Sequence, residues 1–417
     1  MKVRNMVSAL LVPVIMACTV QISFAAEWRG SGTKDDPYLI SSADDWSKFR
    51  KYVNGDDDGG AGEYWKLTAD IDFKQTESQG WIAPVGKYDV GAQDEPAEGK
   101  MFQGNFDGDG HVVKNYTIDA VKNELGNHGA FGLFSAIGGD AVIENLGAEN
   151  VTLRMGADHI YISAGAVAGT MIGNAKITNC YSKNVICDNA NPEGQYITSG
   201  GLAGSMYDSA SVINSYGRLF TPGKKLMYYG GIVGGIYSQA AVIQNCYSDT
   251  SIAVVSDCDW NNSWYNLYYV QDMTKTWPGN RGSGNGWFKD GKTGYIGTRV
   301  TEAELKAVPN ELRANFIADD GTNDGWPILR PLTVKMTRTT DEVNDGRVGF
   351  YIEEMYLPAY KSVVVDYTNG TGGYPLAKLI EADVNSNVTF GLQINDVPEI
   401  YRNDISVSLS KREVSGK

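Results

Sequence analysis

Histidine and cysteine are scarce in this chain. Its 417 residues include only three histidines and five cysteines, and neither a CxxC pair nor an HExxH motif occurs. Zinc sites and zinc peptidases depend on such spacings. The sequence therefore predicts no metal site and no cofactor.

Positive charge is also deficient. Lysine and arginine number 36 against 50 aspartates and glutamates, which gives a formal net charge of −14. A chain of this charge repels phosphate backbones and anionic lipid surfaces. Nucleic acid is therefore not an expected partner.

Only one hydrophobic run suggests a targeting signal, and it covers residues 6–17. Lys2 and Arg4 precede it, and Ser23 and Ala25 follow it as the small residues of a signal-peptidase site, which predicts a signal peptide over residues 1–25. Residues 15–18 also fit a lipobox loosely, so a lipid anchor on Cys18 is the alternative. The run is too short to span a bilayer, and no membrane span is expected elsewhere. Both alternatives predict an exported protein, extracellular or on the outer cell surface.

An internal repeat is the clearest pattern in the rest of the chain. Short apolar runs end in an asparagine, at steps of 30, 34, 35 and 31 residues, and a degenerate sixth copy follows at Asn266. The five regular copies end at Asn115, Asn145, Asn179, Asn214 and Asn245.

Each repeat contains two or three short strand-like runs and is too small to bury its own apolar side. Stacked coils solve this problem, which predicts a parallel β-helix with coils about 4.8 Å apart. Asparagine suits a corner because it tolerates left-handed backbone angles. A β-propeller, whose blades need roughly 40–45 residues, and a β-sandwich are the alternatives.

Glycine-rich strands precede the later asparagines. Residues 201–204 read Gly-Leu-Ala-Gly, ten residues before Asn214, and residues 231–234 read Gly-Ile-Val-Gly before Asn245. This pattern resembles the GLUG-motif repeat of secreted bacterial proteins, over roughly residues 27–330. The resemblance implies a right-handed parallel β-helix. It also implies surface adhesion, or attachment to peptidases, without a common active site.

The ends of a solenoid need covers. Residues 42–53 have the helical spacing of an amphipathic helix, and Thr301 with Glu304 forms a capping-box pattern that predicts a helix to about residue 315. Beyond residue 330 the repeats stop and strand-like alternation begins. We therefore predict an all-β protein with a right-handed parallel β-helix and short capping helices over residues 26–330, and a small antiparallel β domain over 331–417.

A tyrosine follows most repeat asparagines by two residues. If strand alternation resets at the corner, these tyrosines point outward as a stripe that could bind a sugar chain. If it does not, they pack in the core or against its flank. The stripe consists of Tyr181, Tyr216, Tyr247 and Tyr268.

Two further predictions come from the repeats. Cys180 and Cys246 lie two coils apart, about 9.6 Å, which is too far for a disulfide. Six aromatic residues fall between residues 260 and 277, where Trp260 and Trp264 are candidate ligand contacts, or else part of a plug that seals the last coil.

The sequence thus favours an exported protein for adhesion or glycan binding, with an extracellular glycan or a host or cell-surface protein as partner. No catalytic residues can be named. The alternative is a carbohydrate-active enzyme, a polysaccharide lyase or glycoside hydrolase, that works in a lateral groove of the β-helix.

Overall fold

The computed structural model describes residues 28–330 with gaps at 57, 77–78, 92–97, 123–127, 157–160, 191–196, 222–227, 250–254, 259–262, 271–285, 288–292 and 295–297. Beyond residue 330 it describes only strands, and between 250 and 299 the only side chains described are those of Leu267, Tyr268 and Val270. The predicted signal peptide, Cys18 and Trp260 lie outside the described residues. No helix in the described part is long and apolar enough to cross a membrane.

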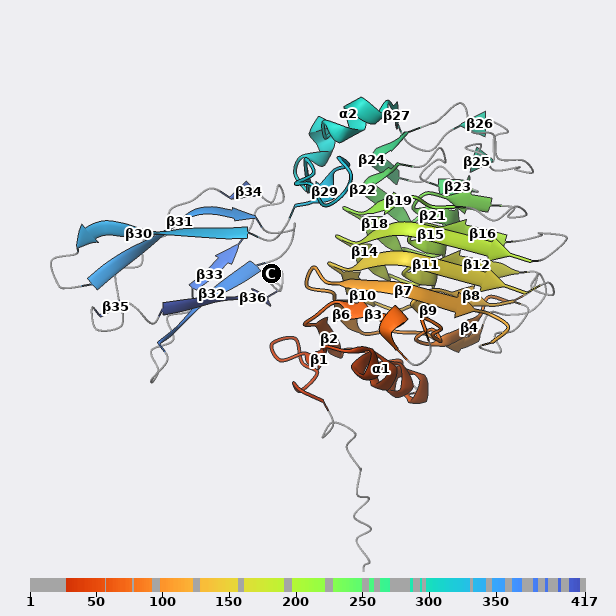
Figure 1. Cartoon of the computed structure of the whole chain (residues 1–417), viewed down its shortest axis with the longest axis horizontal. Coiled ribbons are helices and arrows are strands. Elements are labelled where there is room, and N and C mark those ends of the chain that lie inside the picture. Colours follow the sequence, from red (N-terminus) through yellow and green to blue (C-terminus); the bar gives the residue numbers. More distant parts are fainter. Residues whose placement is uncertain are drawn as a thin grey trace, which may run out of the picture.

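The predicted all-β parallel β-helix is confirmed (Figure 1). Its strands pair in parallel with the equivalent strands one coil before and after. Three successive coils contain four strands each in the same order. The first two consist of β8 (Ala130–Phe131), β9 (Phe134–Ile137), β10 (Val142–Glu144) and β11 (Gly147–Met155), then β12 (Ile162–Gly165), β13 (Ala168–Met171), β14 (Lys176–Thr178) and β15 (Tyr181–Asn189).

Further coils lie on either side of these two. The strands before them are β1 (Tyr38–Ile40), β2 (Tyr64–Leu67), β3 (Ile71–Asp72), β6 (Asn105–Asp107) and β7 (Val112–Asp119). The strands after them are β16 (Ile197–Gly200), β17 (Ala203–Met206), β18 (Ser211–Ile213), β19 (Tyr216–Arg218), β20 (Tyr228–Gly230), β21 (Val233–Ile236), β22 (Val242–Ser248), β23 (Val255–Cys258), β24 (Ser263–Val270) and β27 (Thr298–Val300). A hairpin of β4 (Lys87–Asp89) and β5 (Glu98–Lys100) precedes β6, and a short antiparallel pair joins β25 (Gly286–Trp287) to β26 (Thr293–Gly294).

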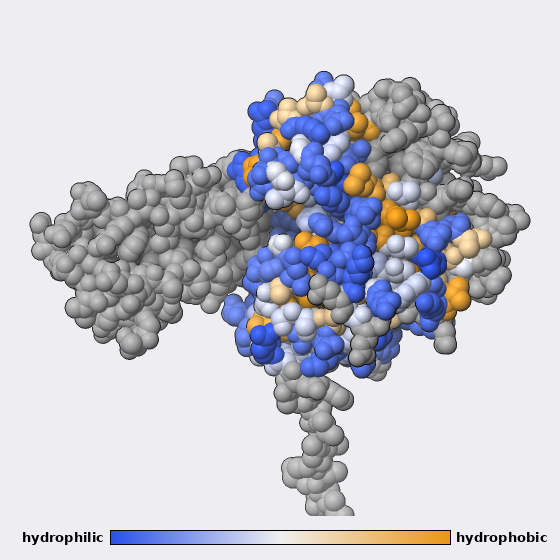
Figure 2. All heavy atoms as spheres, in the orientation of Figure 1, coloured by the Kyte–Doolittle hydropathy of each residue, from blue (hydrophilic) through white to orange (hydrophobic). Residues whose placement is uncertain are grey.

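The strands form inner and outer sheets. One inner sheet contains β8, β12, β16 and β20, and the other contains β9, β13, β17, β21 and β23. Every residue of β12, β13, β16 and β17 is buried, so both faces of these sheets are covered. In the outer sheet, by contrast, buried and partly exposed residues alternate in β10 and β14. Hydrophilic residues predominate on the described surface in Figure 2, with smaller hydrophobic patches.

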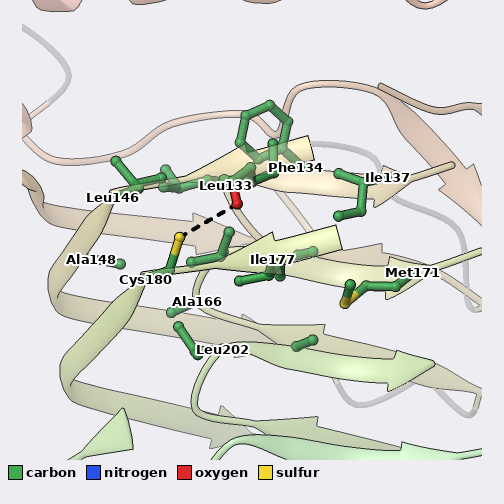
Figure 3. Packing of buried hydrophobic residues seen from close by; sticks show 14 of the residues in the cluster. Leu133, Phe134, Ile137, Leu146, Ala148, Ala166, Met171, Ile177, Cys180 and Leu202 are labelled. Atoms are coloured by element: carbon green, nitrogen blue, oxygen red, sulfur yellow. Dashed lines mark hydrogen bonds between the residues drawn. The ribbon is translucent and has the colours of Figure 1, made fainter. Parts of the chain in front are cut away.

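The Gly-Leu-x-Gly motif forms the turn between the two inner sheets. A Cβ at Gly204 would lie 2.3 Å from the Ala164 nitrogen, so only glycine permits this approach of the two backbones. Leu202 between the glycines is fully buried, and Figure 3 shows it on the same side of the core as Leu146 and Cys180. The motif is therefore a packing device as well as a turn.

The predicted asparagine corner is confirmed. Asn145, Asn179, Asn214 and Asn245 all have left-handed backbones, with φ between 50° and 53°. Their side chains also bond along the file, for instance from Asn245 Nδ2 to Asn214 Oδ1 at 2.9 Å. The degenerate copy is in register as well, because Leu267 of β24 pairs with Cys246.

Asn115 does not belong to the file of Asn145, contrary to the sequence prediction. Strand β7 pairs Tyr116 with Val151, so Asn115 aligns with Asn150 and, one coil on, with Asn184. These three form a second left-handed ladder, with side-chain bonds of 2.9 and 2.8 Å. The two files have nearly the same period, so spacing alone placed Asn115 in the file of Asn145. The first step of 30 residues is short because it joins a residue of one file to a residue of the other.

Cysteines occupy inward positions beside the first asparagine file. Cys180, Ser215 and Cys246 align through the pairing of β15, β19 and β22, and each is fully buried. Ser215 therefore separates the two sulfur atoms, and both thiols are free, as expected. Burial raises the pKa of each thiol to about 12.

Both ends carry helices. At the N-terminal end α1 (Ala43–Gly55) begins after Ser42, whose side chain accepts from the Asp45 amide, and buries Trp46 and Phe49. Helix α2 (Glu302–Lys306) has the predicted capping box but ends well before residue 315. Pro309 and the left-handed Val308 interrupt it, and a 3-10 turn, η3 (Asn310–Leu312), follows. A short hairpin of β28 (Phe316–Ile317) and β29 (Ile328–Leu329) completes this segment.

The strands beyond residue 330 pair antiparallel, as predicted. One sheet has the order β30-β31-β34 and another β33-β32-β36, while β35 also pairs with β31. Their bounds are Thr333–Glu342 (β30), Arg347–Tyr356 (β31), Ser362–Asn369 (β32), Lys378–Glu381 (β33), Asn387–Val388 (β34), Val397–Pro398 (β35) and Ile405–Arg412 (β36). The domain boundary at residue 330 stays a prediction.

Candidate functional site

The predicted tyrosine stripe exists. The rings of Tyr181, Tyr216 and Tyr247 stack with centroids 4.9 and 5.0 Å apart and planes within 9° of parallel. Tyr268 continues the register beside Tyr247. The strand alternation does reset at the asparagine corner, because the residues just before the tyrosines point into the core.

An exposed stripe was one of two alternatives, and the structure contradicts it because these rings pack under a cover. Tyr216 is 3% exposed, Tyr247 0% and Tyr268 9%, because residues 301–330 fold back over the rings. We call this segment the lateral cap. Burying such flat aromatic surfaces is favourable, which gives the physical reason for the cover. The cap contributes Leu305, Val308, Leu312, Phe316 and Trp326 to this second hydrophobic cluster.

The tyrosine hydroxyls are also engaged. Tyr247 donates to the Pro327 carbonyl at 2.5 Å, and Tyr268 donates to Glu311 at 2.7 Å. Burial, assisted by Glu311, raises the pKa of Tyr268 to about 12. Only Tyr181, at the open end of the stripe, is half-buried, and its hydroxyl donates to Glu149 at 2.9 Å. The stripe is thus mainly an internal interface.

Arg218 fastens the cap to the coils. Its guanidinium pairs with Asp249 at 2.9 Å, and both side chains are 2% exposed. The same group donates to the Asn323 carbonyl of the cap at 2.8 Å and pairs with Asp324 at 3.3 Å. We call this arrangement the Arg218 clamp.

The two predicted tryptophans are not brought to this stripe by any described contact. Trp264 pairs in register with Ile243, a fully buried residue of the outer sheet. Trp260 lies outside the described residues. Their role as ligand contacts stays a prediction.

A different tyrosine surface is exposed. At the corner between the second inner sheet and the outer sheet, Ile172, Tyr207 and Tyr237 follow strands in equivalent register and form a file along the solenoid. All three are partly exposed, and the rings of Tyr207 and Tyr237 lie 5.3 Å apart. Burial raises the pKa of Tyr207 to about 12, so it stays a neutral hydroxyl at physiological pH.

The β4–β5 hairpin adds a third tyrosine to this corner. The Tyr88 amide donates to Ser135 Oγ at 2.9 Å, which fixes β4 against the inner sheets. Tyr88 is partly exposed, and burial together with nearby Asp208 and Asp89 raises its pKa. Tyr88 also lies close enough to Tyr207 to influence its pKa. We call Tyr88, Tyr207 and Tyr237 the corner platform.

Polar side chains run beside the platform. Asp140, Asn174 and Ser209 occupy equivalent exposed turn positions in successive coils, and Asn174 Nδ2 donates to Asp140 Oδ1 at 2.8 Å. Asp208, also exposed, accepts from the Gly173 amide at 2.9 Å. The corner therefore combines flat aromatic rings with an ordered row of hydrogen-bonding groups.

Sequence reasoning missed this platform, although a signal was present. Tyr207 and Tyr237 each stand three residues after the second glycine of a Gly-Leu-x-Gly-type motif, and Ile172 stands three after Gly169. The repeat asparagines are the stronger sequence signal, but the tyrosines that follow them are covered.

The platform combines two kinds of chemical group. Aromatic rings with polar tips stack on the apolar faces of sugars and other planar groups, while amides, hydroxyls and carboxylates bond to hydroxyls. In the described part of the chain no cluster of three or more His, Cys, Asp or Glu side chains could hold a metal ion.

Comparisons with known proteins give partial matches, and no family model matches the chain. Over 145 residues the chain is 31% identical to halomucin of Haloquadratum walsbyi. This aligned segment is 34% of this chain and 1% of halomucin. Over 149 residues the chain is 28% identical to a candidate Gly-rich membrane protein of Evansella cellulosilytica. The aligned segment is 35% of this chain and 14% of that protein. The chain thus spans only a small part of these relatives.

One solved structure is also similar. It is the crystal structure of a candidate immunoglobulin A1 protease from Bacteroides ovatus, with a TM-score of 0.42 and 21% sequence identity. The match covers 72% of this chain and 94% of that chain.

Proposed function

We propose that this protein is exported and binds an extracellular polysaccharide along the corner platform, as an adhesion or glycan-binding protein of the cell surface. The observation that carries the proposal is the partly exposed pair Tyr207 and Tyr237, in successive coils with rings 5.3 Å apart. The predicted signal peptide, the GLUG-like repeats and the names of the two partial relatives support the location.

The geometry suits an extended chain that runs parallel to the solenoid axis. Successive coils repeat every 4.8 Å or so, and three coils supply the file Ile172, Tyr207 and Tyr237, a span of roughly 10 Å. Asn174 and Ser209 lie on the same corner within reach of sugar hydroxyls. A linear glycan could therefore stack on the rings and form hydrogen bonds with the row beside them.

A glycan array followed by affinity electrophoresis tests the proposal. Tyr207→Ala combined with Tyr237→Ala should weaken binding of any array hit at least about tenfold, since buried aromatic contacts dominate such interfaces. Tyr181→Ala is the matched control, because Tyr181 is half-buried on the outer sheet under the edge of the lateral cap. Binding that survives the double substitution but is lost in the Tyr181 variant would move the site to the stripe.

Gly235→Ala provides a second test that keeps both tyrosines. A Cβ at position 235 would lie 2.7 Å from the Tyr237 hydroxyl, so the ring must move. Weakened binding is expected, whereas Gly55→Ala, where a Cβ meets nothing within 4 Å, should bind as before. New reducing ends or unsaturated products from a bound glycan would instead establish the enzymatic alternative, and the absence of any bound glycan would refute the proposal.

A further inference from the structure

The polar edge of the corner platform is rich in carboxylates, each held by a neighbouring N–H group. Asp208 accepts from the Gly173 amide at 2.9 Å, and Asp89 accepts from the Gly91 amide at 2.8 Å. Asp140 accepts from Asn174 Nδ2 at 2.8 Å. In each case the bond engages one oxygen, which orients the carboxylate and leaves a second oxygen as an acceptor.

Two of these groups lie near a tyrosine of the platform, and Asp140 belongs to the polar row beside it. Asp208 and Asp89 both act on Tyr88, since their charges help to raise its pKa. None of the three aspartates forms an ion pair with a lysine or arginine in the part of the chain that the structure describes. The platform therefore presents negative charge that basic side chains do not neutralise, on a protein that is already strongly acidic.

Ionised carboxylates accept hydrogen bonds and donate none. A ligand must therefore supply donors, as sugar hydroxyls do. Ligand carboxylates and sulfates also only accept, so they would leave the aspartates unpaired and meet them with like charge.

We propose that the corner platform selects uncharged, hydroxyl-rich glycan chains and rejects chains that carry uronate or sulfate groups. This inference rests on the proposed function, because it concerns the specificity of the same site. Asp208 is the main determinant, as its carboxylate follows directly after Tyr207 and acts on Tyr88.

Affinity electrophoresis with matched polymers tests this selectivity. The probes are hydroxyethylcellulose against carboxymethylcellulose, dextran against dextran sulfate, and methyl-esterified against de-esterified homogalacturonan. In each pair that binds, the neutral polymer should bind about tenfold more tightly at low salt, and the ratio should shrink as salt screens the charges.

In Asp208→Asn the amide oxygen can still accept from the Gly173 amide. Asparagine also tolerates the left-handed backbone of position 208, where φ is 49°. The substitution should reduce the neutral-to-anionic ratio about threefold. Asp188→Asn is the control of equal charge change, because Asp188 lies on β15 and is paired with Arg154 at 3.0 Å. The neutral-to-anionic binding ratio of the Asp188→Asn variant should match that of the unmodified protein.

The outcomes separate the two proposals. Equal or tighter binding of the anionic polymers, still abolished by the Tyr207 and Tyr237 substitutions, would overturn the selectivity and leave the glycan platform standing. An equal effect of Asp188→Asn and Asp208→Asn would also overturn it, because net charge would then account for the selectivity. Failure of every polymer to bind would remove both proposals.

Discussion

Replacing Arg218 with methionine should detach the lateral cap from the tyrosine stripe. The guanidinium is almost completely buried, pairs with the equally buried Asp249, and donates to Asn323 of the cap. Methionine roughly preserves the apolar stem but leaves the Asp249 charge and the Asn323 carbonyl without this donor.

The expected magnitude follows from that burial. Removing one partner of a buried ion pair typically costs about 3–5 kcal/mol, because the other charge stays in a poorly solvated site. Pairs with an exposed partner contribute far less, so Asp324, which is mostly exposed, adds little. We therefore expect the unfolding free energy of the cap to fall by about 3–5 kcal/mol.

Two measurements check this prediction. Urea unfolding followed by circular dichroism gives the loss of stability, and acetylation of tyrosine hydroxyls followed by peptide mass spectrometry reports whether Tyr216 and Tyr247 become accessible. Lys66→Met is the control, because Lys66 and its partner Asp109 are both about one-third exposed. It should change stability by no more than about 1 kcal/mol.

A double substitution identifies the cause. If the stranded charge of Asp249 dominates the cost, adding Asp249→Asn to Arg218→Met should restore part of the lost stability, so that the two effects are not additive. An Arg218→Met protein within about 1 kcal/mol of the unmodified protein, with Tyr247 still protected, would refute the clamp.

Four further predictions concern the coils. Leu202→Ala should lower the unfolding free energy by about 2.7–5 kcal/mol in urea titrations, because Leu202 is fully buried at the inner turn. Gly204→Ala should lower the midpoint of thermal unfolding, since its Cβ would clash with the Ala164 backbone. Asn150→Ala should cost about 1–2 kcal/mol at its left-handed position while Asn150→Gly costs less, as measured by urea. Cys180 and Cys246 should resist a thiol reagent until denaturant is added, and rapid labelling of either one in the native protein would contradict their burial.

Much of the fold could be predicted because a repeated residue imposes a repeated backbone. Asn179 and Asn214 mark corners since asparagine tolerates positive φ, and the spacing of about 35 residues fixes the length of one coil. The error at Asn115 has the same origin. A second file with the same period cannot be separated from the first by spacing alone, and only the pairing of Tyr116 with Val151 distinguishes them.

The candidate site could be predicted only in part. The direction of a side chain depends on neighbouring residues in the sequence, whereas its burial can depend on a segment far away in the chain. That Tyr216 and Tyr247 point out of the core follows from the corner just before them. That they are buried depends on a contact between Arg218 and Asn323, which lie 105 residues apart in the chain. Nothing in the repeat encodes such a distant contact.

The solenoid thus has two files of tyrosines. One is buried and the other is partly exposed, and this difference has a physical reason. Along the outer sheet the rings stack nearly parallel, which creates a flat apolar surface that the lateral cap can cover. At the corner, Tyr207 and Tyr237 are tilted by 30°, and turn residues such as Asp208 interrupt the surface beside them. Such a surface is too polar to form a hydrophobic interface with the chain itself, but it matches a ligand that is apolar on its faces and hydroxylated at its edges. The uncovered file is therefore the one for which we propose ligand binding.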